Sequence, residues 1–190
     1  MRVIGGVFRG RRLKSPEGIS TRPTSDRVRE SLFDVIAPRI KDARFLDAYA
    51  GTGAVGIEAI SRGAKDVVFI EDARKALDSL ETNLKMLGIT DRVRVLRQPF
   101  DRSAIALGRE SAPFDLIFLD PPYGHVEILK ALRLVHATAL LSARGLLVAE
   151  HDATLALPPE EGSLALTRTL RYGGTVLSLY TPVDRPERRP

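Results

Sequence analysis

Continuous apolar runs and helically spaced apolar positions alternate along the chain from Arg44 to Glu150. Short apolar runs between turn residues are typical of strands buried on both faces, and spacings of three and four indicate amphipathic helices. Alternating strands and helices favour a mostly parallel sheet with helices on both faces. The predicted strands span 45–49, 67–70, 93–96, 114–119 and 146–150. One predicted helix ends at Arg62, a second begins after its cap Asp72 and ends before Gly88, and two more span 102–109 and 126–137.

The first 44 residues carry a different pattern. Residues 2–14 alternate weakly and are rich in Gly and Arg, which predicts a short basic hairpin with too little apolar content to join the core. After a loop, a single apolar stripe predicts a helix that is capped by Thr24 or Ser25 and ended by Pro38.

The carboxyl-terminal part adds a hairpin to the sheet. Gly173 and Gly174 predict a turn between strands at 164–170 and 175–180. We therefore expect an α/β fold with a mostly parallel seven-stranded sheet and one antiparallel edge strand. The first and fourth strands flank the switch in strand order, where such sheets bind ligands at their carboxyl ends. The Arg- and Pro-rich residues 182–190 are expected to form a disordered tail.

Composition bounds the class of protein. With 190 residues the chain favours a single domain with a sizeable core. It contains no cysteine, which excludes a cysteine nucleophile and a thiolate-bound metal, and its three histidines lack metal-site spacing. Because there is no run of 18 apolar residues and no charged-then-apolar leader, we expect a cytoplasmic protein without membrane contact.

Positive charge is concentrated in the amino-terminal part. The formal net charge is +5, and residues 1–44 contain 11 Lys and Arg against 5 Asp and Glu. Such an excess indicates a surface for a polyanion, with nucleic acid first, and a merely solvated basic face is the alternative. The candidate phosphate-binding residues are Arg9, Arg11, Arg12, Lys14, Arg22 and Arg27. Arg22, Arg27 and Arg29 surround the start of the predicted helix, where they either meet phosphates or pair with Asp26 and Glu30.

The fourth predicted strand stops at an unusual turn. The apolar run 116–119 is followed by Asp120, Pro121, Pro122 and Tyr123. Two prolines cannot continue a hydrogen-bonded ladder, so the chain leaves the sheet in a rigid turn that aims side chains and carbonyls outward. This rigidity indicates a functional site, and the alternative is a tight strand exit without function.

A glycine-rich loop follows the first strand. Residues 51–56 match the pattern Gly-x-Gly-x-x-Gly, and Glu71 follows at the spacing of a ribose-binding acid. The pattern fits a dinucleotide oxidoreductase, an S-adenosylmethionine enzyme or a structural turn. Asp47, four residues before the glycines, is poorly placed for a pyrophosphate and well placed for the cationic amino group of a methionyl moiety.

Four segments resemble a known family. They are Asp-Ala-Tyr-Ala-Gly-Thr-Gly-Ala-Val-Gly-Ile-Glu-Ala-Ile-Ser-Arg-Gly-Ala at 47–64, Asp-Pro-Pro-Tyr at 120–123, Thr-Arg-Pro-Thr-Ser-Asp-Arg-Val-Arg-Glu at 21–30 and Arg-Tyr-Gly-Gly-Thr at 171–175. Together they are similar to the bacterial 16S ribosomal RNA guanine-N2 methyltransferases. The resemblance covers nearly the whole chain and implies a Rossmann-like class I methyltransferase fold. The expected layout is a basic extension at 1–44, a cofactor-binding core at 45–181 and the tail.

The resemblance also implies residue roles. The residues expected to bind S-adenosylmethionine are Asp47, Ala50, Gly51, Thr52, Gly53, Glu71, Asp72, Phe100 and Asp101, and those expected to hold the base are Asp120, Pro121, Pro122 and Tyr123. One segment departs from the family pattern. Where an acid usually follows the third strand and binds the adenine amino group, this chain has Gln98, and either Asp101 or stacking on Phe100 replaces that acid.

The residue types suit methylation of a nucleobase amine. The lone pair of such an amine is delocalised into the ring, so Asp120 and the Pro121 carbonyl would each accept one N–H and direct the lone pair at the methyl group. We expect a monomer without metal that acts on 16S ribosomal RNA or the assembling small subunit. Three alternatives stay open: an adenine-N6 methyltransferase of DNA or RNA, an NAD-dependent oxidoreductase, and an RNA-binding protein without catalysis.

Overall fold

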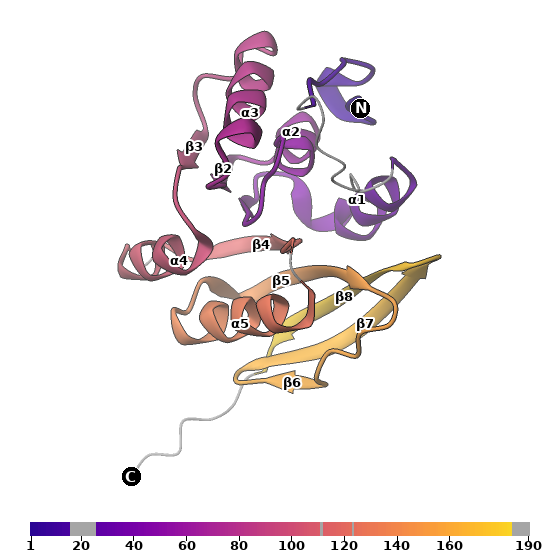
Figure 1. The fold of residues 1–190 in the computed structure, drawn as a ribbon, viewed down its shortest axis with the longest axis vertical. Helices are drawn as coiled ribbons and strands as arrows, with labels where there is room; N and C mark the ends of the chain where they lie inside the picture. Colours follow the sequence, from indigo (N-terminus) through magenta and orange to yellow (C-terminus); the bar gives the residue numbers. More distant parts are fainter. Residues whose placement is uncertain (16–25, 111, 123, 184–190) are drawn as a thin grey trace.

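The computed structural model describes residues 1–15, 26–110, 112–122 and 124–183. Its centre is an eight-stranded sheet in the order β3-β2-β1-β4-β5-β8-β7-β6 (Figure 1). The strands are β1 (Arg44–Asp47), β2 (Asp66–Ile70), β3 (Val93–Leu96), β4 (Phe114–Leu119), β5 (Leu141–Asp152), β6 (Glu160–Glu161), β7 (Leu164–Tyr172) and β8 (Thr175–Pro182). The helices are η1 (Gly6–Phe8), α1 (Asp26–Ile40), α2 (Ala54–Ser61), α3 (Arg74–Met86), α4 (Phe100–Arg109) and α5 (Gly124–Ala137).

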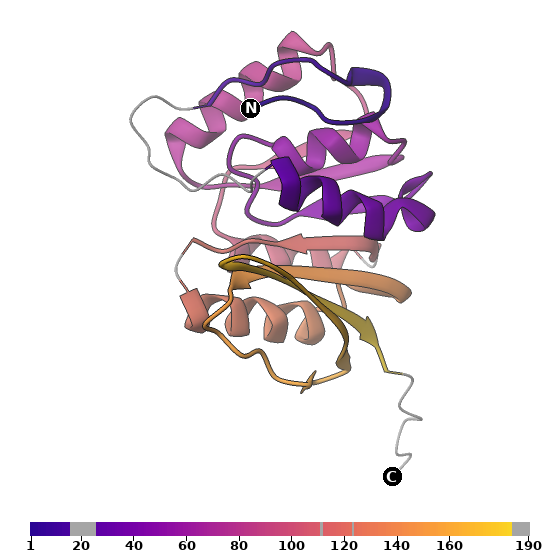
Figure 2. The same cartoon turned by 90° about the vertical axis from the view of Figure 1, so that its right-hand side faces the viewer.

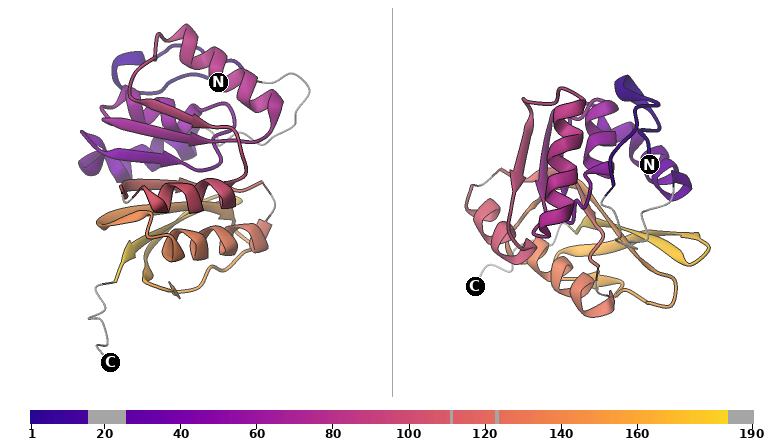
Figure 3. Two further views of the ribbon diagram at one scale, coloured as in Figure 1. Left: turned by 90° about the vertical axis from the view of Figure 1, so that its left-hand side faces the viewer. Right: turned by 45° about the horizontal axis from the view of Figure 1, so that its top comes forward.

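Helices cover both faces of the sheet. Buried side chains of α1, α2 and α3 form one apolar cluster with one face, and those of α4 and α5 form a second cluster with the other face. Figure 2 shows α1, α2 and the amino-terminal segment, and the left view of Figure 3 shows α4 and α5 side by side. The predicted α/β layering is confirmed. No helix in the described part of the chain is long and apolar enough to cross a membrane.

The strand order reverses between β1 and β4. From β1 the chain moves outward to β2 and β3, then returns to place β4 on the other side of β1. Both neighbours of β1 are parallel to it, with Asp47 opposite Phe69 of β2 and Phe118 of β4. The carboxyl ends of these strands therefore open on one edge of the sheet, as the sequence predicts for a ligand site.

The predicted number of seven strands is wrong. An additional two-residue strand, β6, pairs with the start of β7 and forms the edge of the sheet. It lies directly after Pro158 and Pro159, in a stretch predicted as a loop, and two residues are too few to show an alternating pattern. The antiparallel β8 lies between β5 and β7, because the hairpin folds back onto the outer side.

Two predicted helix ends are also wrong. Pro38 lies inside α1, which continues to Ile40, because a proline in the last turn disrupts only hydrogen bonds near the end of the helix. Asp72 does not cap α3, because the N-cap residue of this helix is Ala73. Instead the carboxylate of Glu71 accepts hydrogen bonds from the backbone N–H groups of Asp72 and Ala73, at 2.9 and 2.8 Å. The predicted caps of α1 lie outside the described residues. The tail was predicted from residue 182, but Pro182 is the last residue of β8 and pairs with Leu164, and residues 184–190 lie outside the described residues.

The basic hairpin contributes to the core, contrary to expectation. Arg2 and Arg12 form an antiparallel bridge around the turn η1, so the predicted hairpin exists in outline. Val3 and Leu13 are 1% and 6% exposed and belong to the cluster that includes α1 and α2. Two apolar residues ten positions apart therefore join the segment to the core.

The third glycine of the loop motif allows close packing of α2 on the sheet. A Cβ atom at Gly56 would lie 2.2 Å from Cε1 of Phe69, whose side chain is fully buried in β2. Backbone and ring therefore approach more closely than any larger residue permits.

We predict that Gly56→Ala lowers the free energy of unfolding by about 1 to 3 kcal/mol through overpacking, although alanine ordinarily favours a helix. Urea denaturation measures the change. In a Phe69→Leu background the same substitution should cost clearly less, because the ring that the new methyl group meets is gone. Equal costs in the two backgrounds would contradict this explanation.

Candidate active site

The glycine loop turns the chain sharply from β1 into α2. Gly51 and Gly53 have φ angles of +54° and +80°, in the left-handed region that glycine tolerates. A Cβ atom at Gly53 would lie 2.2 Å from Cδ1 of Leu80, whereas one at Gly51 would meet nothing within 4 Å. The backbone at Gly51 therefore faces open space. A ligand can approach it directly, flanked by the half-buried Thr52 and the buried Ala50.

Asp47 lies under this loop at the end of β1. Its side chain is 1% exposed, and Oδ2 accepts a hydrogen bond of 2.8 Å from the backbone N–H of Gly56. Burial raises the pKa of Asp47 from 3.8 to about 7, the Gly56 hydrogen bond opposes the rise, and the negative charges of Asp120 and Glu71 add to it. The three predicted acids therefore act on one another electrostatically across the switch in strand order.

Glu71, at the end of β2, joins the loop to the start of α3. Its Oε2 accepts a 2.7 Å hydrogen bond from the N–H of Gly51, while Oε1 accepts the two bonds from the α3 start described above. A carboxylate oxygen accepts two hydrogen bonds, so Oε2 keeps one acceptor position for a ligand hydroxyl.

A cavity of about 310 Å³ opens beside Glu71. Its walls combine apolar side chains with carboxylates, which suits a nucleoside-sized ligand. Five predicted residues line it, namely Glu71, Asp72, Phe100, Asp101 and Pro122. The lining does not include Asp47, Ala50, Gly51, Thr52, Gly53, Asp120 or Pro121, which the switch in strand order brings together beside it.

The lining also contains residues that were not predicted from the sequence, among them Tyr49, Glu127 and Lys130. Tyr49 packs against Phe100, with ring centroids 5.3 Å apart, and Glu127 and Lys130 of α5 form an ion pair of 2.8 Å. Burial raises the pKa of Tyr49, and the charges of Glu127, Asp101 and Asp72 add to the shift. A detectable signal existed for the α5 pair, because acid and base at i and i+3 occupy one side of a helix that follows the turn at 120–123.

The turn after β4 places its residues at different depths. Asp120 and Pro121 are half-buried, and Pro122 is exposed and reaches the cavity. Asp120 is near enough to Asp47 to raise its pKa. Tyr123 lies outside the described residues, so its predicted role stays a prediction.

Five of the six candidate RNA contacts are exposed. They are Arg9, Arg11, Arg12, Lys14 and Arg27, and Arg22 lies outside the described residues. Arg11 also donates a 3.4 Å hydrogen bond to the carbonyl of Met86 at the end of α3. Residues 2–14, here called the basic segment, therefore lie beside the helices that flank the glycine loop (Figure 2).

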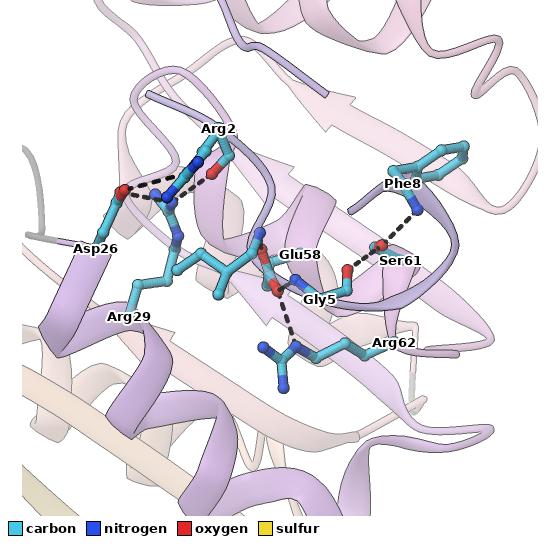
Figure 4. A network of polar contacts seen from close by, with 9 residues as sticks. Arg2, Gly5, Phe8, Asp26, Arg29, Glu58, Ser61 and Arg62 are labelled. Atoms are coloured by element: carbon cyan, nitrogen blue, oxygen red, sulfur yellow. Dashed lines mark hydrogen bonds and ion pairs between the residues drawn. The ribbon is translucent and has the colours of Figure 1, made fainter. Parts of the chain in front are cut away.

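A buried polar network fastens this segment to α2 (Figure 4). Glu58, fully buried, accepts 2.7 Å hydrogen bonds from the N–H groups of Ile4 and Gly5 and one of 2.8 Å from Nε of Arg62. Ser61 Oγ accepts from the N–H of Phe8 and donates to the Gly5 carbonyl. None of these contacts uses the positively charged side chains of the segment.

Arg29 secures the same segment from α1. Its side chain is fully buried, and Nη2 donates to the carbonyl of Arg2 at 2.5 Å and to Asp26 at 3.0 Å. Burial lowers the pKa of Arg29, and the charges of Asp26 and Glu58 oppose that shift. Of the two alternatives weighed for the start of this helix, Arg29 pairs with Asp26 and is not available to phosphates.

The topology and the known structures define the class of protein. The protein yhhF of Escherichia coli has the same fold, with a TM-score of 0.86 and 32% identity over 97% of this chain and 99% of that chain. In this chain the strand order of a mostly parallel sheet reverses between β1 and β4, a glycine loop follows β1 and an acid follows β2. Together with the similarity to yhhF, these features identify the Rossmann-like fold of a methyltransferase.

The particular family follows from the sequence comparisons. The chain belongs to the family described as Conserved hypothetical protein 95, whose model matches residues 1–181. YlbH of Bacillus subtilis is 41% identical over 180 residues, which cover 95% of this chain and 98% of that protein. Ribosomal RNA small subunit methyltransferase D of Escherichia coli is 34% identical over 180 residues, with coverage of 95% and 89%.

The raised pKa of Asp47 makes stability depend on pH. Between about pH 4 and 7 the native state holds a proton on Asp47 that the unfolded state has released, so the free energy of unfolding falls as pH rises and is constant above. We predict that the difference between wild type and Asp47→Asn declines over this range by up to about 1.4 kcal/mol per pH unit. Urea denaturation at several pH values measures it, and a difference independent of pH would contradict the raised pKa.

Proposed function

We propose that the protein transfers a methyl group from S-adenosylmethionine to the exocyclic N2 of a guanine in 16S ribosomal RNA. The observation that carries the proposal is the set of carboxylates Asp47, Glu71 and Asp120, which three neighbouring strands bring to one edge of the sheet. A relative named for methylation of small-subunit ribosomal RNA, at 34% identity, supports the substrate class.

The residues present fit S-adenosylmethionine. Gly51 leaves its backbone open to a ligand, Oε2 of Glu71 keeps an acceptor position for a ribose hydroxyl, and Phe100 offers an apolar wall for a purine ring. Asp101 lines the same cavity and would accept a hydrogen bond from an adenine amino group. When bound, this cofactor supplies an electrophilic methyl group on a sulfonium.

Asp47 would respond to the positive charge of such a ligand. A carboxyl that is half-protonated near pH 7 ionises when a cation is placed beside it. Its Oδ2 already accepts a hydrogen bond from the N–H of Gly56. Once Asp47 is ionised, the remaining lone pairs of its two oxygens can accept hydrogen bonds from an ammonium group. Cofactor binding is therefore accompanied by release of a proton near neutral pH.

Asp120 and the Pro121 carbonyl would align the guanine amine. Each accepts one N–H, which draws the nitrogen toward a tetrahedral shape and points its lone pair at the methyl group. No strong base is needed before transfer, because the methylated nitrogen is acidic enough to lose its proton afterwards. The main contribution of the chain is alignment, with nitrogen and methyl carbon held about 3 to 3.5 Å apart.

We predict that Asp120→Asn lowers kcat about a hundred- to a thousandfold, because an amide can present a donor where an acceptor is required. The affinity for S-adenosylmethionine, measured by calorimetry, should change little. Digested RNA from the wild-type reaction should contain N2-methylguanosine. Full activity of the variant, N6-methyladenosine as product, or binding of NAD without S-adenosylmethionine would each overturn the proposal.

The exposed basic residues would hold RNA phosphates. Val3 and Leu13 are part of the core, so deleting the segment would disturb the fold, and charge removal is the sharper test. We predict that Arg9→Gln, Arg12→Gln and Lys14→Gln together flatten the slope of log affinity against log salt by about 2, at roughly 0.7 per lost contact to single-stranded RNA. Filter binding measures the slope. An unchanged slope would show a solvated face without RNA contacts.

A further inference from the structure

A buried asparagine connects the basic segment with the glycine loop. Asn83 of α3 is fully buried, and its Oδ1 accepts a 2.7 Å hydrogen bond from the N–H of Lys14. Its Nδ2 donates to the carbonyl of Lys14 at 3.1 Å and to the carbonyl of Thr52 at 3.0 Å. One amide therefore contacts two segments that lie 69 and 31 residues away in the sequence.

The residue type is specific to this task. A primary amide combines two N–H donors with a carbonyl acceptor, and here both hydrogens and the oxygen are used. An aspartate would keep the acceptor for Lys14 but would set a carboxylate against two carbonyls. A leucine, the residue type of the neighbouring buried positions Leu80 and Leu84, would leave all three backbone groups without these bonds.

The contact leaves the charge of the segment available. Asn83 binds only the backbone of Lys14, whose side chain is exposed. At the other end of the segment, Glu58 and Ser61 likewise bind backbone groups of the segment and none of its charged side chains, and they belong to the helix that starts at the glycine loop. The hydrogen bonds that join the segment to the cofactor loop and to its helix thus use backbone groups of the segment.

We propose that Asn83 is a positioning residue that couples RNA binding at the basic segment to cofactor binding at the glycine loop. Phosphates that restrain Lys14 also restrain, through Asn83, the carbonyl of Thr52. A loop that is already ordered loses less entropy when its ligand binds, so each ligand increases the affinity of the protein for the other. The coupling is reciprocal. This inference rests on the proposed function, because it assumes that the segment binds RNA.

The test measures binding without turnover. Equilibrium dialysis gives the Kd of radiolabelled S-adenosylhomocysteine, the demethylated cofactor, with and without saturating deproteinised 16S ribosomal RNA. For the wild type we expect the RNA to lower this Kd by about fivefold or more, the lower end of typical coupling factors. For Asn83→Ala the two Kd values should agree. The control Ser79→Ala, on the same helix, removes only a bond to the carbonyl of Lys75 and should keep the wild-type factor.

A second variant separates coupling from general damage to the fold. Asn83→Asp should lose the coupling at pH 8 and regain part of it at pH 5.5, because a protonated carboxyl can again donate to one carbonyl. The wild-type factor at each pH is the reference. The inference would be overturned if RNA bound to the wild type without changing the Kd of S-adenosylhomocysteine. It would also be overturned if RNA lowered this Kd as much in Asn83→Ala as in the wild type. A wild type that binds neither deproteinised 16S ribosomal RNA nor small subunits would instead overturn the proposed function, and the inference with it.

Discussion

The site depends on how carboxylates hold a loop of glycines. Asp47 accepts from Gly56 and Glu71 accepts from Gly51, so the two ends of the loop are fixed by acids from adjacent strands. Gly51 has a left-handed φ of +54° there, which glycine tolerates. The same acids face the candidate ligand site, so the loop cannot be fixed without gathering negative charge there. Burial is the main cause of the raised pKa of about 7 at Asp47, and the negative charges of Asp120 and Glu71 add to it.

Local patterns in the sequence predicted the central strands well. The strands β3 and β4 have the predicted bounds, because their apolar runs lie between residues that favour turns. The switch in strand order followed from the alternation of strands and helices, and it brought Asp47 and Asp120 together as predicted. The two-residue strand β6 was not predictable, because its pairing is set by the neighbouring strand and not by its own residues.

The polar contacts of the amino-terminal segment were not predicted, although a signal for them exists. Glu58 interrupts an apolar helix, and Asn83 lies next to a stripe of buried leucines. A polar side chain at a buried helical position needs a partner, and a partner more than 50 residues away cannot be identified from one sequence. Arg29 shows the same limit, since its burial against the Arg2 carbonyl depends on how α1 meets the segment.

The anchoring of the basic segment also fixes the order in which the protein can fold during synthesis. The segment leaves the ribosome before its partners, because Glu58 and Asn83 follow it by 54 and 69 residues. Ile4 and Gly5 cannot bond to Glu58 until α2 has been made, and Lys14 cannot bond to Asn83 until α3 has been made. Contacts at such sequence separation form late, since the intervening chain must be ordered first. The nascent chain therefore completes the connection between its basic surface and its glycine loop only after α3 has been made.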